Sequence, residues 1–299
     1  MTTAAPWRLA AASVIGSSHA AAGTVCQDAH AARIRPDGVL VAAIADGAGS
    51  APHSARGASV AVAAAVGTLF DASMDNGETR GDRAATALAA ALRAAAAAVH
   101  ALAEAEGLAP RDLACTLSCA MVGPDGALAA QIGDGFVVVG VDEGGHDEGG
   151  HDEGGHDEGE DDAASSAATH ALVPLSAPER GAYANETVFL TSPNAVETAI
   201  ETMQRFDGPV AAVALLTDGL LRLAMNMAER TPHVGFFEPL FRFVSRPVAV
   251  DGYMAGDADQ GGRADRALTA FLESPRVRAR TDDDVTLVLA ARPAPADPP

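Results

Sequence analysis

Two segments of the chain share one order of apolar and polar positions. Residues 35–47 (RPDGVLVAAIADG) and residues 123–135 (GPDGALAAQIGDG) each place a Pro-Asp-Gly turn before a run of small and apolar residues that ends in Asp-Gly. Apolar stretches, HAARI and CTLSCAMV, also precede the two turns. Each segment therefore predicts a β-hairpin whose second strand ends at an aspartate. The continuous apolar run VLVAAIA indicates a strand covered on both faces.

Helical patterns flank these hairpins. Residues 54–74 follow the first hairpin and residues 85–107 precede the second. The second helix is rich in alanine, a strong helix former, and Gly107 is placed to end it. Further strands are expected at ALVPL, ETVFLTS, PVAAVALL, FVVVGVD and DDVTLVLAA, and residues 220–277 read as mixed, with a Gly/Asp-rich loop before the helix ADRALTAFLES. The order predicts a single α/β sandwich domain over residues 1–292.

Composition narrows the class of protein. At 299 residues and 48% apolar content the chain can bury a large core. It begins without a basic signal region, and its apolar stretches fall short of the roughly 20 residues that span a bilayer. The three cysteines form no disulfide-like framework. The net charge of −20 opposes binding to nucleic acid or anionic membranes. We expect a cytoplasmic monomer.

Much of the negative charge belongs to one repeat. Residues 144–160 read GGHDEGGHDEGGHDEGE, and eleven carboxylates lie within residues 142–162, so the rest of the chain carries about −9. Paired glycines and dense charge oppose regular structure, which predicts a disordered insertion at about residues 142–166 between two strands. Loose binding of Zn²⁺ or Ni²⁺ there leaves open a metal-storage or nickel-sensing role. Residues 293–299 are expected to form a disordered tail.

Aspartates at strand ends are the candidate chemistry. Asp46, Asp134 and Asp218 come directly after apolar runs, Asp28 precedes a strand, and Asp283 precedes the last one. Most Asp-Gly pairs are only turns, and each residue taken alone could be a turn or cap residue. If the strand ends meet, however, the carboxylates repel one another unless a cation lies among them. An all-oxygen ligand set favours magnesium or manganese.

The motifs that contain these aspartates carry a resemblance. CQDA, AIADGAGSAPHSARGA, IGDGF, LLTDGLL and DDVTLVLA, in this order, resemble the motif series of the PP2C (PPM) family of metal-dependent protein serine/threonine phosphatases. The resemblance extends over about residues 14–291. It implies a four-layer αββα sandwich, two β-sheets flanked by helices, with a two-metal centre of Mn²⁺ or Mg²⁺ between the sheets.

The resemblance also implies roles for single residues. Asp46 matches the ligand that bridges both ions, with the Gly47 carbonyl beside it, and Asp218 and Asp283 match the other direct ligands. Asp28 matches the residue that supports the metal-bound water. Asp134 matches a ligand of a weaker third ion. The implied reaction is hydrolysis of phosphoserine and phosphothreonine in a protein substrate by a hydroxide that bridges the two ions, without a phosphoenzyme.

The chain also departs from the family pattern. Gln27 stands where many members have glutamate, GDG replaces GDS, and Asp284 occupies an asparagine position. The arginine that holds the substrate phosphate in the family is absent, and the nearest polar candidate for binding the phosphate or protonating the leaving group is His19. These features are typical of an atypical bacterial branch. They leave an alternative open, a pseudophosphatase or phosphoprotein-binding regulatory module of the same fold without turnover.

Overall fold

Two antiparallel five-stranded sheets face each other in the computed structural model, which describes residues 5–73, 81–142, 170–176, 187–226, 228–229, 231–246 and 257–293. The first sheet has the order β1 (Arg8–Val14), β12 (Val285–Ala291), β9 (Ala212–Leu216), β6 (Phe136–Asp142) and β7 (His170–Ser176). The second has the order β2 (Ala29–Ile34), β3 (Leu40–Ala45), β4 (Leu117–Val122), β5 (Gly126–Ile132) and β8 (Gln204–Asp207). A short ribbon joins β10 (Met225–Asn226) and β11 (Thr231–Pro232).

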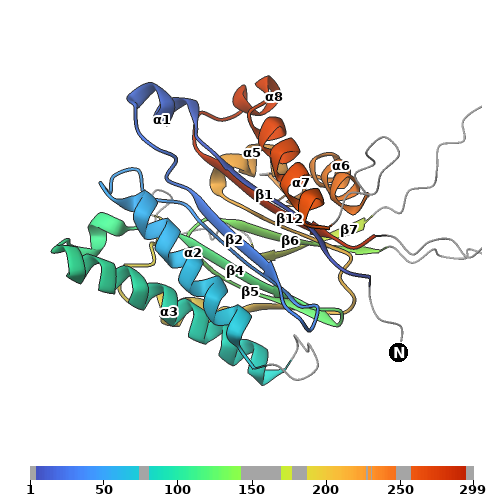
Figure 1. Cartoon of the computed structure of the whole chain (residues 1–299), viewed down its shortest axis with the longest axis horizontal. Helices are drawn as coiled ribbons and strands as arrows, with labels where there is room; N and C mark the ends of the chain where they lie inside the picture. The colour runs from blue at the N-terminus through green and yellow to red at the C-terminus, as the bar shows by residue number, and fades with distance from the viewer. Residues whose placement is uncertain are drawn as a thin grey trace, which may run out of the picture.

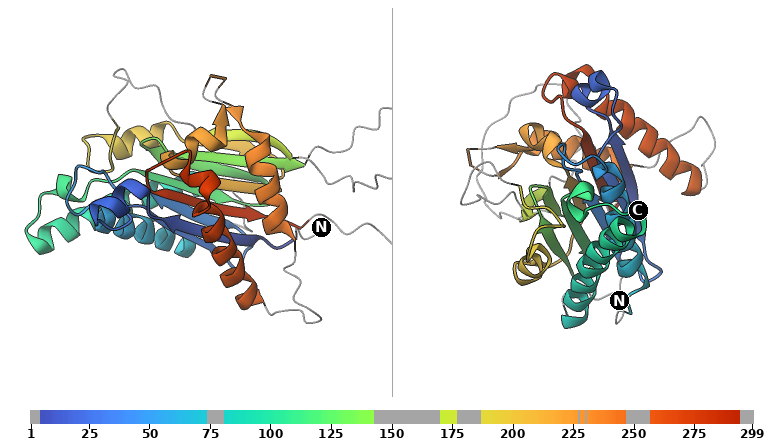
Figure 2. Two further views of the ribbon diagram at one scale, coloured as in Figure 1. Left: turned by 90° about the horizontal axis from the view of Figure 1, so that it is seen from above. Right: turned by 90° about the vertical axis from the view of Figure 1, so that its left-hand side faces the viewer.

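Helices cover the outer face of each sheet (Figures 1 and 2). Helices α2 (Ser54–Asp71) and α3 (Asp82–Glu106) pack on the second sheet, while α6 (Val234–Ser245) and α7 (Asp257–Leu272) pack on the first. The shorter helices are α1 (Ser17–Ala22), α4 (Ala195–Glu201), α5 (Leu221–Ala224) and α8 (Pro275–Arg278). The molecule is therefore the four-layer αββα sandwich that the sequence motifs imply.

Strand β3 shows why this arrangement suits the sequence. Successive side chains of a strand point to opposite faces. Val41 and Ala43 of β3 pack into the core beneath α2 and α3, whereas Leu40 and Ile44 pack into the core between the sheets. All of β3 is buried, which confirms the expectation that the run VLVAAIA is covered on both faces.

The two long helices also follow the sequence pattern. Helix α3 ends where Gly107 takes a left-handed conformation, with φ 68°, and its N–H bonds to the carbonyls of Ala103 and Glu104. By length and composition alone α3 would be able to cross a membrane, so the expectation that every apolar stretch is too short is wrong. In this fold Leu88 and Leu92 of α3 are fully buried in the core over the second sheet.

Other expectations fail locally. Residues 187–192, from the predicted strand ETVFLTS, form turns rather than a strand. The N–H of Leu190 bonds to the Cys115 carbonyl, and Phe189 and Ser192 close a turn on each other ahead of Pro193, so no sheet partner is used. Strands β1 and β8 were not expected, and α7 begins at Asp257, within the stretch predicted to be a loop.

Two predicted features fall on residues outside the described part of the chain. Asp142 ends β6 and His170 begins β7, and these residues pair across the two strands. Residues 143–169, which hold nearly all of the predicted insertion, lie outside the described residues, as do residues 294–299 of the predicted tail. The predicted insertion is attached at Asp142, at the end of β6 that is remote from Asp134.

Candidate functional site

Strand ends from both sheets bring the predicted aspartates together. Asp28 precedes β2 and Asp46 follows β3, and these two strands pair antiparallel so that the start of one lies beside the end of the other. In the facing sheet Asp218 follows β9 and Asp283 precedes β12, which pair in the same way. Each sheet thus contributes two aspartates to one end of the sandwich.

The electrostatics of Asp46 show how close these aspartates lie. Burial, followed by the charges of Asp28, Asp218 and Asp283, raises the pKa of Asp46 to about 10. Burial and the charges of Asp134 and Asp283 raise the pKa of Asp218 to about 6. Carboxyl groups that raise one another's pKa in this way share a small volume of low polarity. The five predicted aspartates therefore form one group, which we call the aspartate cluster: Asp28, Asp46, Asp134, Asp218 and Asp283.

Asp28 is the most firmly held member of the cluster. Its side chain lies in a buried position, and burial raises its pKa to about 7 although the hydroxyls of Thr217 and Thr286 stabilise the charged form. The Thr217 hydroxyl donates to Asp28 Oδ2 at 2.8 Å. The other oxygen, Oδ1, is buried and accepts no hydrogen bond from any N–H or hydroxyl group in the described residues. The two threonines were not anticipated, although both stand inside the motifs LLTDG and DDVT.

The donor chemistry of the cluster fits a hard divalent cation. The group consists of carboxylate oxygens, and the buried Oδ1 of Asp28 and Oε1 of Gln27 have no protein partner among the described residues. Raised pKa values mean that the group gains stability from added positive charge. No three His, Cys, Asp or Glu side chains in the described part of the chain already stand as a coordination shell, so a bound ion would draw the carboxylates closer.

Gly47 lies where two backbone segments nearly touch. A Cβ atom at this position would lie 2.8 Å from the Gln27 carbonyl oxygen and 2.9 Å from the backbone carbon and Cβ of Ser54. Only glycine allows that approach. Because Gly47 follows Asp46 directly, the close packing fixes the position of the Asp46 backbone against the segment that carries Asp28.

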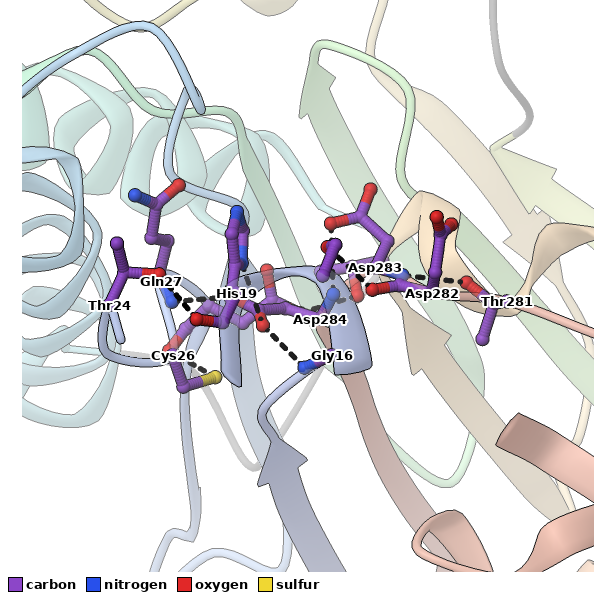
Figure 3. A network of polar contacts seen from close by, with 12 residues as sticks. Gly16, His19, Thr24, Cys26, Gln27, Thr281, Asp282, Asp283 and Asp284 are labelled. Carbon is purple, nitrogen blue, oxygen red and sulfur yellow. Dashed lines mark hydrogen bonds and ion pairs between the residues drawn. The ribbon is translucent and has the colours of Figure 1, made fainter. Parts of the chain in front are cut away.

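Asp284 has a different role from its neighbour Asp283. Its side chain is buried, and its oxygens accept hydrogen bonds from the Gly16 N–H at 2.7 Å and the Gln27 N–H at 2.5 Å. Figure 3 shows this network with Asp283 next to it. Asp284 therefore ties the segment before β12 to the segments around α1 and β2. The sequence analysis noted only that Asp284 occupies an asparagine position of the family pattern and did not anticipate this anchoring.

His19 is the basic side chain that the structure places beside this anchor. Its Nδ1 lies 2.9 Å from Asp284 Oδ1, and its side chain is partly exposed. The contact with Asp284 is the largest cause of a raised pKa for His19, and burial acts against it. The charges of Asp283 and Asp28 raise that pKa further, so His19 borders the aspartate cluster. Its second nitrogen, Nε2, makes no hydrogen bond or ion pair within the described residues.

Asp134 lies in the connection from β5 of the second sheet to β6 of the first. Its Oδ2 accepts a hydrogen bond from the Thr187 hydroxyl at 3.2 Å. Its charge reaches Asp218, whose pKa it helps to raise. Asp134 thus stands at the border of the cluster, on the side of Asp218.

Comparison with known sequences identifies the class of protein. The family described as Protein phosphatase 2C matches residues 15–158 and 161–272. These ranges include the motifs of Asp28, Asp46, Asp134 and Asp218, while Asp283 lies beyond the second range. The chain belongs to the protein phosphatase 2C family.

Individual relatives agree with this assignment. Serine/threonine-protein phosphatase 3 of Escherichia coli (strain K12) is 36% identical over 288 residues, which cover 95% of this chain and 98% of that protein. Among solved structures, the serine/threonine phosphatase Stp1 from Staphylococcus aureus is 12% identical with a TM-score of 0.57, covering 98% of both chains. The Mycobacterium tuberculosis serine/threonine phosphatase PstP/Ppp is 17% identical with a TM-score of 0.53, covering 96% of this chain and 99% of its own. These structures share the fold.

Proposed function

We propose that this chain is a protein serine/threonine phosphatase that hydrolyses phosphoserine and phosphothreonine with the help of two manganese or magnesium ions. The observation that carries the proposal is the aspartate cluster, in which strand ends of both sheets place carboxylates close enough to raise the pKa of Asp46 to about 10. Membership of the protein phosphatase 2C family supports the reaction class. The E. coli relative carries the name of a serine/threonine-protein phosphatase.

In this proposal Asp46 would hold both ions, because the charges of aspartates from both sheets act on its buried carboxyl group. Asp218 and Asp283 would be the other carboxylate ligands, Gly47 would contribute its carbonyl oxygen, and Asp134 would serve a third, weaker ion. When bound, divalent ions supply positive charge to the transferring phosphate and lower the pKa of a bound water toward neutrality. Without that charge, a phosphate dianion would meet several carboxylates at once.

The chain's own groups then orient the reactants. Asp28 keeps Oδ1 free of hydrogen bonds from described N–H and hydroxyl groups, so this oxygen can accept a hydrogen bond from the attacking water. His19 is held at Nδ1 by Asp284, which leaves Nε2 to donate to a phosphate oxygen or to the leaving oxygen of the substrate. Because the contact with Asp284 raises its pKa, His19 stays protonated to a higher pH than a free histidine and so has a proton to donate.

The test of the proposal is release of phosphate from a phosphothreonine peptide in the presence of Mn²⁺. Wild type should turn over the peptide, lose turnover in EDTA and regain it when Mn²⁺ or Mg²⁺ is restored. Asp46→Asn and Asp218→Asn should each abolish turnover. Asp207→Asn is the matched control, because Asp207 also precedes a glycine but is exposed in β8. Equal background release from all these proteins would favour a binding module without turnover, and full turnover in EDTA would exclude the metal-dependent mechanism.

His19 is tested by a second comparison. His19→Ala should lower kcat/KM by about tenfold or more, because it removes a donor to the phosphate or leaving group. His100→Ala, in the middle of α3 and far along the chain from the cluster motifs, is the control and should leave kcat/KM unchanged. Unchanged kcat/KM in His19→Ala would show that another group contacts the phosphate.

A further inference from the structure

A row of polar side chains lies between the two sheets, immediately behind the aspartate cluster. It consists of Ser13 on β1, His30 on β2, Thr286 on β12 and Thr217 at the end of β9, which we call the polar seam. Asp28 and His30 are two residues apart in an extended segment, so their side chains point to the same face of the sheet. That face looks toward the strands that carry the other three residues.

Hydrogen bonds join the seam into one chain that reaches Asp28. His30 Nδ1 lies 2.8 Å from Ser13 Oγ, and Ser13 Oγ lies 2.6 Å from Thr286 Oγ1. The Thr286 N–H donates to Thr217 Oγ1 at 3.0 Å, and the Thr217 hydroxyl donates to Asp28 Oδ2. The chain crosses from one sheet to the other and back.

The two threonines of the seam are buried among apolar side chains, whereas Ser13 and His30 are half-buried. Thr286 is 0% exposed and Thr217 is 2% exposed. The core between the sheets is otherwise built from residues such as Leu40, Ile44 and Val288. A polar group buried in such surroundings costs free energy unless its hydrogen bonds are made, so the partners of the seam are tightly determined.

The direction of the two links nearest Asp28 is fixed, because the Thr286 N–H donates to Thr217 and the Thr217 hydroxyl donates to Asp28. In the other two links either partner can donate, and the tautomer of His30 sets which one does.

We propose that His30 and Ser13 are positioning residues for the reaction, which act on Asp28 through Thr286 and Thr217. The seam holds Oδ2 of Asp28 through the Thr217 hydroxyl and leaves Oδ1 without a hydrogen bond from any described N–H or hydroxyl group. It also ties β1 and β12 of the first sheet to β2 of the second, and so sets the spacing between aspartates that come from different sheets. The kinetic part of this inference rests on the proposed phosphatase function, whereas the hydrogen-bonded connection does not.

The connection is tested by nuclear magnetic resonance on protein labelled with ¹⁵N-histidine in EDTA. The spectrum of His30→Asn assigns the His30 signals among the nine histidines. Ser13→Ala should shift the Nδ1 signal of His30, because it removes the hydrogen-bond partner of that nitrogen, whereas Thr68→Ala should leave the signal in place. An unchanged Nδ1 signal in Ser13→Ala would overturn the inference.

The positioning role is tested by kinetics with a phosphothreonine peptide and Mn²⁺. Ser13→Ala and His30→Phe should each lower kcat by roughly tenfold with KM unchanged, because they release the orientation of Asp28 without touching the substrate. His30→Asn keeps an amide group, which can donate or accept a hydrogen bond, near the position of Nδ1 and should retain kcat within about threefold of wild type. Thr68→Ala is the matched hydroxyl deletion, since the Thr68 hydroxyl bonds only within α2, to the Ala64 carbonyl at 2.9 Å, and it should leave kcat unchanged.

The two arms separate the possible failures. Wild-type kcat in folded Ser13→Ala and His30→Phe would reduce the seam to a purely structural feature and overturn the positioning role. If Ser13→Ala does not fold, the difference between His30→Phe and His30→Asn decides the same point. A wild-type protein without turnover would refute the proposed function, and the histidine spectrum would then decide the inference alone.

Discussion

At the scale of single residues, two adjacent aspartates have opposite environments. Asp283 is exposed beside the cluster, whereas Asp284 is buried and accepts backbone N–H groups from Gly16 and Gln27. The chain bends at Asp282 and Asp283 before β12 begins at Val285, so Asp283 lies on the exposed side of the bend and Asp284 lies on the buried side. The sequence DDD at residues 282–284 does not show which aspartate is buried, because all three residues have the same side chain.

Gly47 provides a prediction at this scale. Gly47→Ala should destabilise the protein by about 1–3 kcal/mol, because the new Cβ would overlap the Gln27 carbonyl and Ser54. It should also lower turnover strongly, because the backbone next to Asp46 has to move. Urea denaturation and phosphate release measure the two effects.

Gly67→Ala is the control for this substitution. Gly67 lies inside α2, and a Cβ there meets no atom within 4 Å. Alanine at this site should therefore stabilise the protein by about 1 kcal/mol and leave turnover intact. Equal behaviour of the two variants would contradict the close packing at Gly47.

At the scale of elements, Arg35 joins the first hairpin to helix α2. Its Nη1 donates to the carbonyls of Leu69 and Phe70 at 2.6 and 3.0 Å, which are among the last carbonyls of α2. Its Nε and Nη2 bond to Asp37 in the hairpin turn. The hairpin predicted from Pro-Asp-Gly is thus locked onto the helix that covers it, and the guanidinium satisfies helix carbonyls that have no partner within the helix.

Loss of Arg35 should be costly. Arg35→Ala should lower the free energy of unfolding by about 2–4 kcal/mol, because it leaves two buried carbonyls and the Asp37 carboxylate without their donor. Urea denaturation at pH 7 measures the change. Arg93→Ala, which removes an exposed ion pair with Glu197, is the control and should have no measurable effect. Similar losses in both variants would refute the anchoring role.

At the scale of the whole molecule, the aspartate cluster brings carboxyl groups of the two sheets together, and the free-energy cost of doing so depends on pH. The pKa values of Asp46, Asp28 and Asp218 are raised to about 10, 7 and 6. Above pH about 4, where a free aspartate loses its proton, the folded protein keeps protons that the unfolded chain has released. The free energy of unfolding therefore falls as the pH rises. In the proposed function, divalent ions would take the place of those protons.

This gives a prediction for thermal unfolding. In EDTA the Tm should fall as the pH is raised from 5 to 9, and Mn²⁺ should raise the Tm most at the upper end of that range. Asp46→Asn should flatten the dependence in EDTA, whereas Asp207→Asn should not alter it. A Tm in EDTA that stays constant between pH 5 and 9 would contradict the clustering of carboxylates.

The GGHDE repeat provides the last prediction. It connects β6 to β7, and its attachment at Asp142 lies about 20 Å along β6 from the end nearest Asp134, at roughly 3.3 Å per residue. Deletion of residues 144–159 should therefore leave turnover of a phosphothreonine peptide within about twofold of the full chain. Complete loss of turnover with the fold intact would mean that the repeat takes part in catalysis.

Much of the fold and of the cluster was predictable from sequence because both depend on local patterns. Apolar runs that end in aspartate identify strands β3, β5 and β9 and the residues at their ends. Strand β1 was not predicted because its pattern of small residues is weak. Residues 187–192 contain a buried apolar residue, Leu190, as a strand would, but this residue lies in a turn, so the strand prediction was wrong. Ser13 and His30 had no motif to mark them.

The sequence by itself determined which residues stand at the ends of which strands, because alternation, turn residues and strand length are properties of neighbours along the chain. Only the tertiary structure decided that Asp284 anchors His19, and that Ser13 and Thr286 connect His30 to Asp28. These contacts join residues as far apart as 273 positions in the chain. They exist only because two sheets pack face to face, and the pairing of side chains across that interface leaves no periodic trace in either strand.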